Sequence, residues 1–396
     1  MTTALANPYT PGQVPRIFAG RVAELDRIRD QVSRVATFGE LGGPLLVFHA
    51  PRGLGKTSLL RTAQRQAAEL GFVSAWVACS RDRPFLPELV RSVERALHRS
   101  DLALDGEDGG RWAARLERVS VELGVPGLKV SGDLRPSGSR PGRASPTAPI
   151  GALEDLLHDA ATLVRGRGGA GLLVFVDELH AATADDLSIL LNALQNLDGE
   201  REDNPLAVIT AGLPVTPEAI TRAATFGERS TFVPLDLLSD DDARAVVTAP
   251  AEALEVRWAD DALALVTDEC RGHPYLLQLL GSTSWAAARP ASGGTVEAEH
   301  VRAGIPAAAD QLDAMYRARW GSATPAERAF LRAMAEAGTD NVTRKQIADR
   351  LGQSTQSISV PRERLIEKGV IEPVGHGLVR FTMPGFDRYV RERAEG

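Results

Sequence analysis

Runs of apolar residues alternate with amphipathic segments over the first 235 positions of this 396-residue chain. Five runs predict buried strands, at residues 44–50, 72–78, 172–176, 206–210 and 232–235. The pattern at 57–70 predicts a helix that Gly71 ends. Because strands alternate with helices, the pattern predicts an α/β fold, with a parallel sheet covered on both faces.

The remaining chain divides into three expected parts, following an α/β domain at residues 1–235. Strands are expected to stop after Leu235, leaving a helical lid at 236–290, a helical linker at 291–323 and a compact terminal module at 324–396. Within the α/β domain, residues 119–130 predict a small hairpin. The Pro-, Gly- and Ser-rich stretch at about 131–149 predicts a disordered loop.

The terminal module shows strong local signals for helix starts. Thr324 with Glu327 three positions later predicts a capped helix, and Thr343 predicts a second helix at 344–351. A third helix is expected at about 354–368, where Pro361 should kink or restart it. Two strands around Gly375–Gly377 follow as a hairpin. Helix, helix, turn, helix and hairpin form the order of a winged helix-turn-helix.

Composition narrows the class of protein. The amino terminus has no signal-peptide pattern, and no apolar stretch approaches the length of a membrane span, so no membrane association is expected. Cys79 and Cys270 match no metal-binding spacing. These features fit a reducing cytoplasm. The formal net charge of −7 argues against a protein that coats nucleic acid with its whole surface, although a local basic patch can still bind it.

A glycine-rich turn between the first strand and the first helix carries the clearest chemistry. It reads Ala50-Pro51-Arg52-Gly53-Leu54-Gly55-Lys56-Thr57, followed by Ser58, and matches the P-loop pattern except for alanine in place of the first glycine. Backbone N–H groups of such a turn cradle phosphates, the lysine reaches the β- and γ-phosphates, and the threonine hydroxyl binds Mg²⁺. Ala50 is acceptable if its φ is negative. We therefore predict a site for ATP and Mg²⁺.

The run at 172–176 ends in a pair of carboxylates. Asp177 is predicted to bind Mg²⁺ at the end of its strand, and Glu178 to orient or deprotonate the attacking water. Glutamate at 178 favours hydrolysis over binding alone. Thr210, at the expected end of the next strand, either contacts the water or γ-phosphate or is an ordinary β-branched strand residue.

Two further motifs give the chain a family resemblance. Ile17-Phe18-Ala19-Gly20-Arg21, with Glu24-Leu25 behind it, resembles the start of origin-recognition and STAND ATPases, and Gly272-His273-Pro274-Tyr275 resembles the Gly-x-Pro element of STAND lids. With the P-loop and the terminal module, the chain resembles bacterial AAA+/STAND-type P-loop ATPases that end in a winged helix and are close to archaeal origin-recognition ATPases. The resemblance implies that Phe18, Gly20 and Arg21 pass near the adenine.

The resemblance also has departures. Tyr275 stands where origin-recognition lids usually carry a sensor arginine, so His273 is either a nucleotide sensor or a turn residue before Pro274. Arg229 lies where the resemblance implies an arginine finger that reaches a neighbouring subunit, and hence a homo-oligomer. A solvated arginine is the alternative, and Arg222 is the weaker finger candidate.

Duplex DNA is the predicted partner of the terminal module. The third helix would present polar and basic side chains that read bases or contact phosphates: Ser354, Thr355, Gln356, Ser357, Arg362, Arg364 and Lys368. The module has only a small positive excess, with 12 Lys/Arg against 10 Asp/Glu over residues 324–396. We therefore predict an ATP-dependent molecular switch that binds DNA. The alternatives are a STAND-type signalling or defence ATPase with a protein-binding or autoinhibitory winged helix, and a nucleotide-bound scaffold with hardly any turnover.

Overall fold

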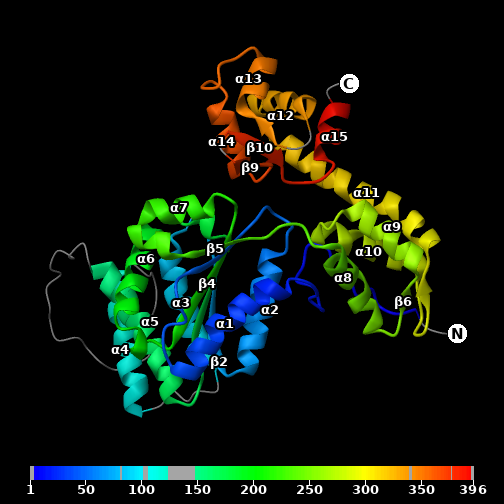
Figure 1. Ribbon diagram of the computed structural model, residues 1–396. Helices are drawn as coiled ribbons and strands as arrows, with labels where there is room; N and C mark the ends of the chain where they lie inside the picture. Colours follow the sequence, from blue (N-terminus) through cyan, green and yellow to red (C-terminus); the bar gives the residue numbers. More distant parts are fainter. Residues whose placement is uncertain are drawn as a thin grey trace. The chain divides into compact units, whose positions relative to one another are not determined.

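The computed structural model describes residues 4–80, 83–100, 106–123, 148–338, 341–375 and 377–393. The chain divides into two compact units. Unit 1 comprises Met1–Arg21, Ala50–Gly55 and Leu235–Gly396, and unit 2 comprises Val22–His49 and Lys56–Pro234 (Figure 1). Unit 2 ends one residue before the expected end of the α/β domain, whereas the expected boundaries at 290 and 323 lie inside unit 1.

Unit 2 is built on a five-stranded sheet in the order β2-β3-β4-β1-β5. Every neighbouring pair is parallel, so the predicted α/β fold is confirmed. The strands occupy the five predicted apolar runs, with bounds β1 Leu46–His49, β2 Phe72–Ala78, β3 Gly171–Asp177, β4 Leu206–Gly212 and β5 Thr231–Pro234.

Helices cover both faces of this sheet. Alternate residues of β2 (Val73, Ala75 and Val77) enter a large apolar core shared with α3, α5 and α6, while α1 and α2 contact the other face (Figure 1). The helices of unit 2 are α1 Val22–Phe38, α2 Lys56–Glu69, α3 Phe85–Arg99, α4 Gly106–Glu122, α5 Ala148–Gly166, α6 Ala184–Gly199 and α7 Thr216–Ala223. Single helical turns are η1 Leu179–Ala181, η2 Arg201–Asp203 and η3 Thr225–Arg229.

The hairpin predicted at 119–130 is wrong in its first part, because residues 119–122 complete α4. Trp112, Leu116 and Val119 are buried at helical spacing, which indicates a helix here. Residues 124–130 of that range, and residues 131–147 of the predicted disordered loop, lie outside the described residues. The last two residues of the predicted loop begin α5.

Unit 1 contains the helices that follow the sheet: α8 Asp240–Glu252, α9 Asp260–Cys270, α10 Pro274–Ala288 and α11 Ala298–Gly321. Strands do not stop after Leu235 as predicted. Two-residue strands β6 Arg257–Trp258 and β7 Thr295–Val296 pair in parallel, and they are too short to leave a hydrophobic pattern in the sequence.

The amino-terminal segment of unit 1 packs into the core of these helices through Tyr9, which is 3% exposed. The Tyr9 hydroxyl donates to the Val247 carbonyl at 2.5 Å and accepts from Trp258 Nε1 at 2.8 Å. The Tyr9 ring also meets those of Trp258 and Trp285 edge to face. Residues 4–15 are therefore a structural part of unit 1.

The carboxyl-terminal part of unit 1 has its own apolar core around Phe330, Met334 and Phe386. Its elements are α12 Pro325–Ala337, β8 Val342–Thr343, α13 Arg344–Leu351, α14 Ser359–Glu367, β9 Ile371–Gly375, β10 Leu378–Phe381 and α15 Phe386–Glu392, with an antiparallel sheet in the order β8-β10-β9. Both predicted caps, at Thr324 and Thr343, are present, and each forms a capping box.

The third helix of this part is shorter than predicted. Residues 354–357 form a turn in which the Ser357 N–H donates to Ser354 Oγ at 3.1 Å, and α14 starts only at Ser359. Pro361 then lies in the first turn of α14, where its missing N–H leaves no helical hydrogen bond unmade. The helix expected to kink or restart at Pro361 therefore begins two residues before it instead.

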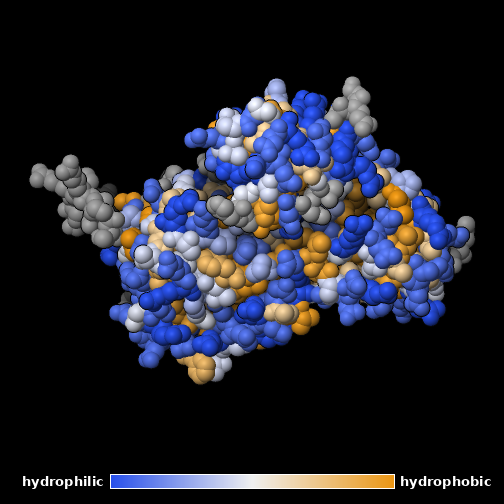
Figure 2. Space-filling view, turned by 45° about the horizontal axis from the view of Figure 1, so that its top comes forward, coloured by the Kyte–Doolittle hydropathy of each residue, from blue (hydrophilic) through white to orange (hydrophobic). Residues whose placement is uncertain are grey.

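The visible surface in Figure 2 is mostly hydrophilic, with smaller hydrophobic areas between the polar ones. Among the described helices, none is both long and apolar enough to cross a membrane.

Candidate functional site

The predicted phosphate loop connects the end of β1 to the start of α2. Gly53 and Gly55 both have a φ of +86°, a conformation that other residues adopt only at a cost. Ala50 is absent from the described residues with positive φ, so alanine is tolerated there without strain. Ala50 therefore has the negative φ that an alanine needs at the first position of the motif.

Thr57 and Asp177 meet at the start of α2 and the end of β3. Thr57 Oγ1 donates to Asp177 Oδ2 at 2.7 Å, and the N–H of Glu178 donates to Asp177 Oδ1 at 2.9 Å. Burial raises the pKa of Asp177, against the opposing effects of these two hydrogen bonds and of the Lys56 charge. The hydroxyl and the carboxylate predicted to share a metal ion are therefore adjacent in unit 2.

Glu178 adopts a strained backbone conformation immediately after β3, with φ +54° and ψ +35°. Such left-handed conformations cost non-glycine residues about 1–2 kcal/mol and cluster at functional sites. The side chain points toward His180, whose Nε2 lies 3.4 Å from Glu178 Oε2. The His180 side chain is buried, and its Nδ1 accepts from the N–H of Leu213 at 3.3 Å.

His180 is a residue that the sequence analysis missed. Because Nδ1 accepts the Leu213 N–H, the neutral ring carries its proton on Nε2, facing the Glu178 carboxylate. His180 can therefore orient Glu178 and stabilise its charge. The only signal in the sequence was its place two residues after Asp177-Glu178, which by itself predicts no contact.

Thr210 is fully buried, and its hydroxyl donates to the Leu46 carbonyl at 3.2 Å. β4 continues two residues further, to Gly212, so Thr210 does not end the strand as expected. The hydrogen bond to β1 explains a polar residue there and favours the alternative of a structural strand residue.

The two candidate finger arginines have different surroundings. Arg229 is exposed at the end of η3, with its guanidinium carbon 5.5 Å from the centre of the Phe226 ring. Arg222 forms an exposed ion pair with Glu218 on the same helix at 2.6 Å. Arg229 is thus the better placed of the two to reach another molecule.

In unit 1, Arg21 holds the phosphate loop from the amino-terminal side. Its side chain is 7% exposed, and Nη2 donates to the carbonyls of Leu54, at 3.4 Å, and of Asp236. Gly20 precedes it with a φ of +74° and lies against the Asp242 side chain. Phe18 is half-buried. The motif at 17–21 therefore contacts the loop itself.

His273 lies against the same loop in unit 1. A Cβ placed on Gly53 would come within 2.9 Å of His273 Cε1. The His273 side chain is 5% exposed, neither ring nitrogen has a hydrogen-bond partner among the described residues, and burial lowers its pKa to about 4. Pro274 follows as the first residue of α10, and the Tyr275 hydroxyl donates to Met315 Sδ at 3.0 Å.

The carboxyl-terminal part also reaches the phosphate loop within unit 1. A Cβ on Gly369, the residue between α14 and β9, would come within 2.8 Å of Arg52 Nε. Arg319 Nη1 donates to the Gly369 carbonyl at 3.1 Å and to Thr382 Oγ1 at 2.9 Å. Burial lowers the pKa of Arg319, and the nearby Arg52 charge lowers it further.

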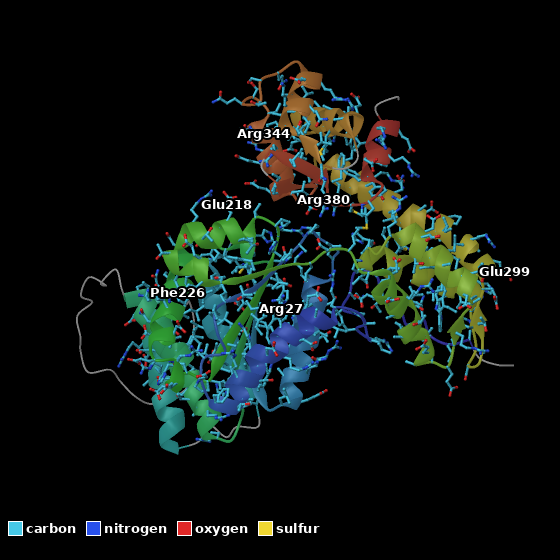
Figure 3. The ribbon with its side chains drawn as sticks, viewed as in Figure 1. Arg27, Glu218, Phe226, Glu299, Arg344 and Arg380 are labelled. Atoms are coloured by element: carbon cyan, nitrogen blue, oxygen red, sulfur yellow. The ribbon has the colours of Figure 1, made fainter. Side chains whose placement is uncertain are left out.

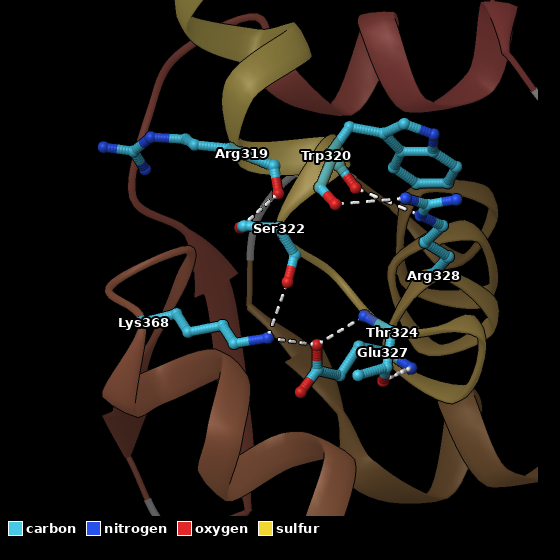
Figure 4. Close-up of polar contacts among 8 residues, drawn as sticks. Arg319, Trp320, Ser322, Thr324, Glu327, Arg328 and Lys368 are labelled. Carbon is cyan, nitrogen blue, oxygen red and sulfur yellow. Dashed lines mark hydrogen bonds and ion pairs between the residues drawn. The ribbon is translucent and has the colours of Figure 1, made fainter.

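The residues predicted to contact DNA fall into two groups. Those at 354–357 are exposed, Arg364 is exposed, and Arg362 is half-buried. Lys368 is committed to the fold, because its Nζ donates to Glu327 at 2.6 Å and to the Ser322 carbonyl at 2.8 Å (Figure 4).

Arg344, at the start of α13, braces the turn that carries the exposed group. Its Nη2 donates to the Thr355 carbonyl at 2.8 Å and to Ser359 Oγ at 2.6 Å (Figure 3). The turn at 354–357 is therefore tied to α13.

Residues 17–209 match the family model of the AAA ATPase domain, and residues 313–390 match a domain of unknown function (DUF8462). With the parallel sheet and the loop between β1 and α2, this match agrees with a P-loop α/β fold of the AAA+ type in that part of the chain. No curated protein sequence matches the chain significantly.

Solved structures of other proteins align with this chain over most of its length. The Orc1 protein of Aeropyrum pernix, solved in complex with DNA, is 17% identical, with 97% of this chain and 94% of that chain covered and a TM-score of 0.44. Cdc6p of Pyrobaculum aerophilum is 11% identical, with 99% and 98% covered and a TM-score of 0.44. The RuvB Holliday junction branch migration motor of Thermotoga maritima is 13% identical, with 94% and 95% covered and a TM-score of 0.43.

Proposed function

We propose that this protein binds ATP with Mg²⁺, hydrolyses it, and uses the nucleotide state to control a DNA-binding winged helix at its carboxyl terminus. The observation that carries the proposal is the 2.7 Å hydrogen bond between Thr57 Oγ1 and Asp177 Oδ2. A hydroxyl at the start of the P-loop helix and a carboxylate at the end of a neighbouring strand are the two protein ligands that an ATP-bound Mg²⁺ requires.

The residues present fit the nucleotide. Gly53 and Gly55 have the left-handed conformations that let a P-loop curl its N–H groups around phosphates, and the buried Lys56 begins α2. Among the described residues no group of three or more acidic, His or Cys side chains forms a metal cage of its own. This agrees with Mg²⁺, which binds through one or two protein ligands together with phosphate oxygens and water. The ion neutralises charge on the phosphates.

Hydrolysis rests on Glu178. In the proposed mechanism, its carboxylate accepts the proton of the water that attacks the γ-phosphate, and His180 holds the carboxylate in position through Nε2. Lys56 stabilises the charge on the transferred phosphate, and Arg229 of a neighbouring copy supplies a second cation. This last role implies a homo-oligomer.

His273 is proposed as the sensor of the bound nucleotide. Within the described part of the chain, neither nitrogen of this ring, which is 5% exposed, has a hydrogen-bond partner beside Gly53, and buried polar groups are normally satisfied. A phosphate on the loop would supply that partner. Arg21 also contacts this loop, through its hydrogen bond to the Leu54 carbonyl.

DNA binding is proposed for the exposed residues before and within α14. Ser354, Thr355, Gln356 and Ser357 can hydrogen-bond to base edges, and Arg362 and Arg364 can contact bases or phosphates. Lys368 is better explained by its pairing with the buried Glu327, so it is the weakest of the original candidates.

The contact between Gly369 and Arg52 supports the coupling, because the carboxyl-terminal part touches the phosphate loop in unit 1. The same contact favours the second candidate, a STAND-type signalling ATPase in which this part restrains the loop or binds a protein. The two candidates differ in whether DNA is bound at all.

Steady-state ATP hydrolysis by wild type and by Glu178→Gln, each with and without duplex DNA, tests the proposal. Turnover that rises with DNA and is lost in Glu178→Gln supports the DNA-coupled switch. Turnover that ignores DNA, together with no band shift on random duplex, supports the signalling ATPase. No turnover by wild type, with ATP still bound, would leave a nucleotide-bound scaffold and overturn the enzymatic part.

Lys56→Ala serves as the binding control. It should abolish ATP binding and change DNA affinity or oligomeric state. If ATP binding is lost while both of these stay unchanged, the nucleotide is not coupled to the winged helix.

A further inference from the structure

A cavity of about 380 Å³ lies at the open edge of the sheet in unit 2, and neither Thr57 nor Asp177 lines it. β2 is the edge strand, and the walls come from β2, α2 and α3. The volume falls in the range of sites that bind small molecules, about 300–1,000 Å³. The cavity is therefore large enough for a compact ligand.

Three arginines line this cavity: Arg61 from α2, and Arg95 and Arg99 from α3. None of the described lining residues is acidic, although the chain as a whole has a net charge of −7. Arg95 is paired with Glu88 at 2.8 Å, whereas Arg99 has no ion pair within the described ranges. The wall thus concentrates positive charge in an otherwise acidic protein.

Arg61 is held in place over an aromatic ring. Its guanidinium carbon lies 3.4 Å from the centre of the Trp76 ring, and Nη1 donates to Gln64 Oε1 at 2.9 Å. The Trp76 ring in turn stacks on Phe175, with 6.0 Å between centroids. A guanidinium fixed in this way loses little conformational freedom when it binds an anion.

Neutral donors complete the wall. Ser74 Oγ is buried and has no hydrogen-bond partner in the described part of the chain. The backbone N–H and C=O of Trp76 are already bonded to Ser92 Oγ of α3, at 2.9 and 2.7 Å. The backbone groups of successive strand residues point to opposite sides of the strand. The N–H and C=O of Ser74 therefore point to the same open edge as those of Trp76, where no further strand of the described residues pairs with β2.

We propose that this cavity is a second ligand site, which binds a small phosphate-bearing anion such as a diphosphate. Guanidinium groups bind phosphate oxygens through paired, charge-assisted hydrogen bonds, and the Ser74 hydroxyl supplies a neutral donor to the same anion. The site shares α2 with the phosphate loop, since Arg61 lies four residues after Thr57 and therefore on the same side of that helix.

Isothermal titration calorimetry with sodium pyrophosphate tests the site in the full-length protein. The variants are Arg61→Gln/Arg99→Gln, the milder Arg99→Gln alone, and Lys56→Ala. Arg65→Gln is the matched control, because Arg65 is exposed on α2 outside the cavity and its loss changes the net charge by the same amount as Arg99→Gln. Circular dichroism establishes that each variant is folded.

The double variant should bind pyrophosphate at least about tenfold more weakly, because it loses two groups that form charge-assisted hydrogen bonds to phosphate oxygens. Arg99→Gln alone should give a smaller loss, while Arg65→Gln and Lys56→Ala should retain the site. Absence of binding to wild type would overturn the proposal. So would binding that Lys56→Ala abolishes and the arginine variants retain, because pyrophosphate would then occupy the phosphate loop.

Two further results would also count against the site. Equal losses in Arg65→Gln and Arg99→Gln would indicate unspecific charge attraction. Binding of a single-stranded oligonucleotide that depends on Arg61 and Arg99, without binding of pyrophosphate, would show a nucleic-acid surface in place of a small-molecule site.

Discussion

Replacing each of the two phosphate-loop glycines by alanine should have unequal effects. Gly53 and Gly55 share a φ of +86°, so both substitutions carry the same conformational cost, about 1–2 kcal/mol. They differ in their surroundings. A Cβ on Gly55 meets no atom within 4 Å, whereas a Cβ on Gly53 would come within 2.9 Å of His273 Cε1.

The contact with His273 adds an overpacking cost of about 1–3 kcal/mol for a buried group that cannot move freely. Gly53→Ala should therefore lower the free energy of unfolding by about 2–5 kcal/mol, and Gly55→Ala by about 1–2 kcal/mol. Urea unfolding followed by circular dichroism measures both losses. In a His273→Ala background, where the imidazole is gone, the two alanine substitutions should cost the same.

Equal losses for the two glycines in the wild-type background would refute this reasoning, because they would mean that His273 does not pack against the loop. An unchanged difference in the His273→Ala background would refute it as well. A larger loss for Gly53→Ala than for Gly55→Ala, with the difference removed by His273→Ala, is the outcome that the geometry requires.

Three other predictions concern single groups. Burial lowers the pKa of His273 to about 4, so the unfolded chain takes up a proton below about pH 6.5 while the folded protein does not. The free energy of unfolding should therefore decrease as the pH is lowered from 6.5 to about 4. Urea midpoints measured against pH should show this decrease in wild type, and a smaller one in His273→Gln. Lys368→Ala leaves the carboxylate of Glu327, which is 1% exposed, without its cation. The free energy of unfolding of the carboxyl-terminal part should fall by about 3–5 kcal/mol, which a lower melting temperature would show. The control Arg364→Ala should leave the melting temperature unchanged. The Thr183 hydroxyl caps α6 by accepting the Asp186 N–H at 3.1 Å. Thr183→Ala should therefore lower the free energy of unfolding in urea by about 1 kcal/mol, and an unchanged value would exclude a capping role.

Local patterns determined much of this protein. The five strands of unit 2, the P-loop and the two capped helices at Thr324 and Thr343 were predicted from apolar runs, glycine positions and cap residues. These signals act between residues a few positions apart, so the sequence displays them directly. The adjacency of Thr57 and Asp177 also followed, because parallel strands bring the ends of β1 and β3 to the same edge of the sheet.

Tertiary structure alone decided which side chains face one another across long stretches of chain. The contact of His180 with Glu178 depends on the Leu213 N–H, and Lys368 is held by Glu327, 41 residues away. The contacts of Gly53 with His273, and of Arg52 with Gly369, join residues separated by hundreds of positions. Such contacts depend on packing the whole unit, and no local periodicity encodes them. For the same reason the sequence leaves Thr210 as a catalytic candidate, whereas in the structure its hydroxyl donates to the Leu46 carbonyl.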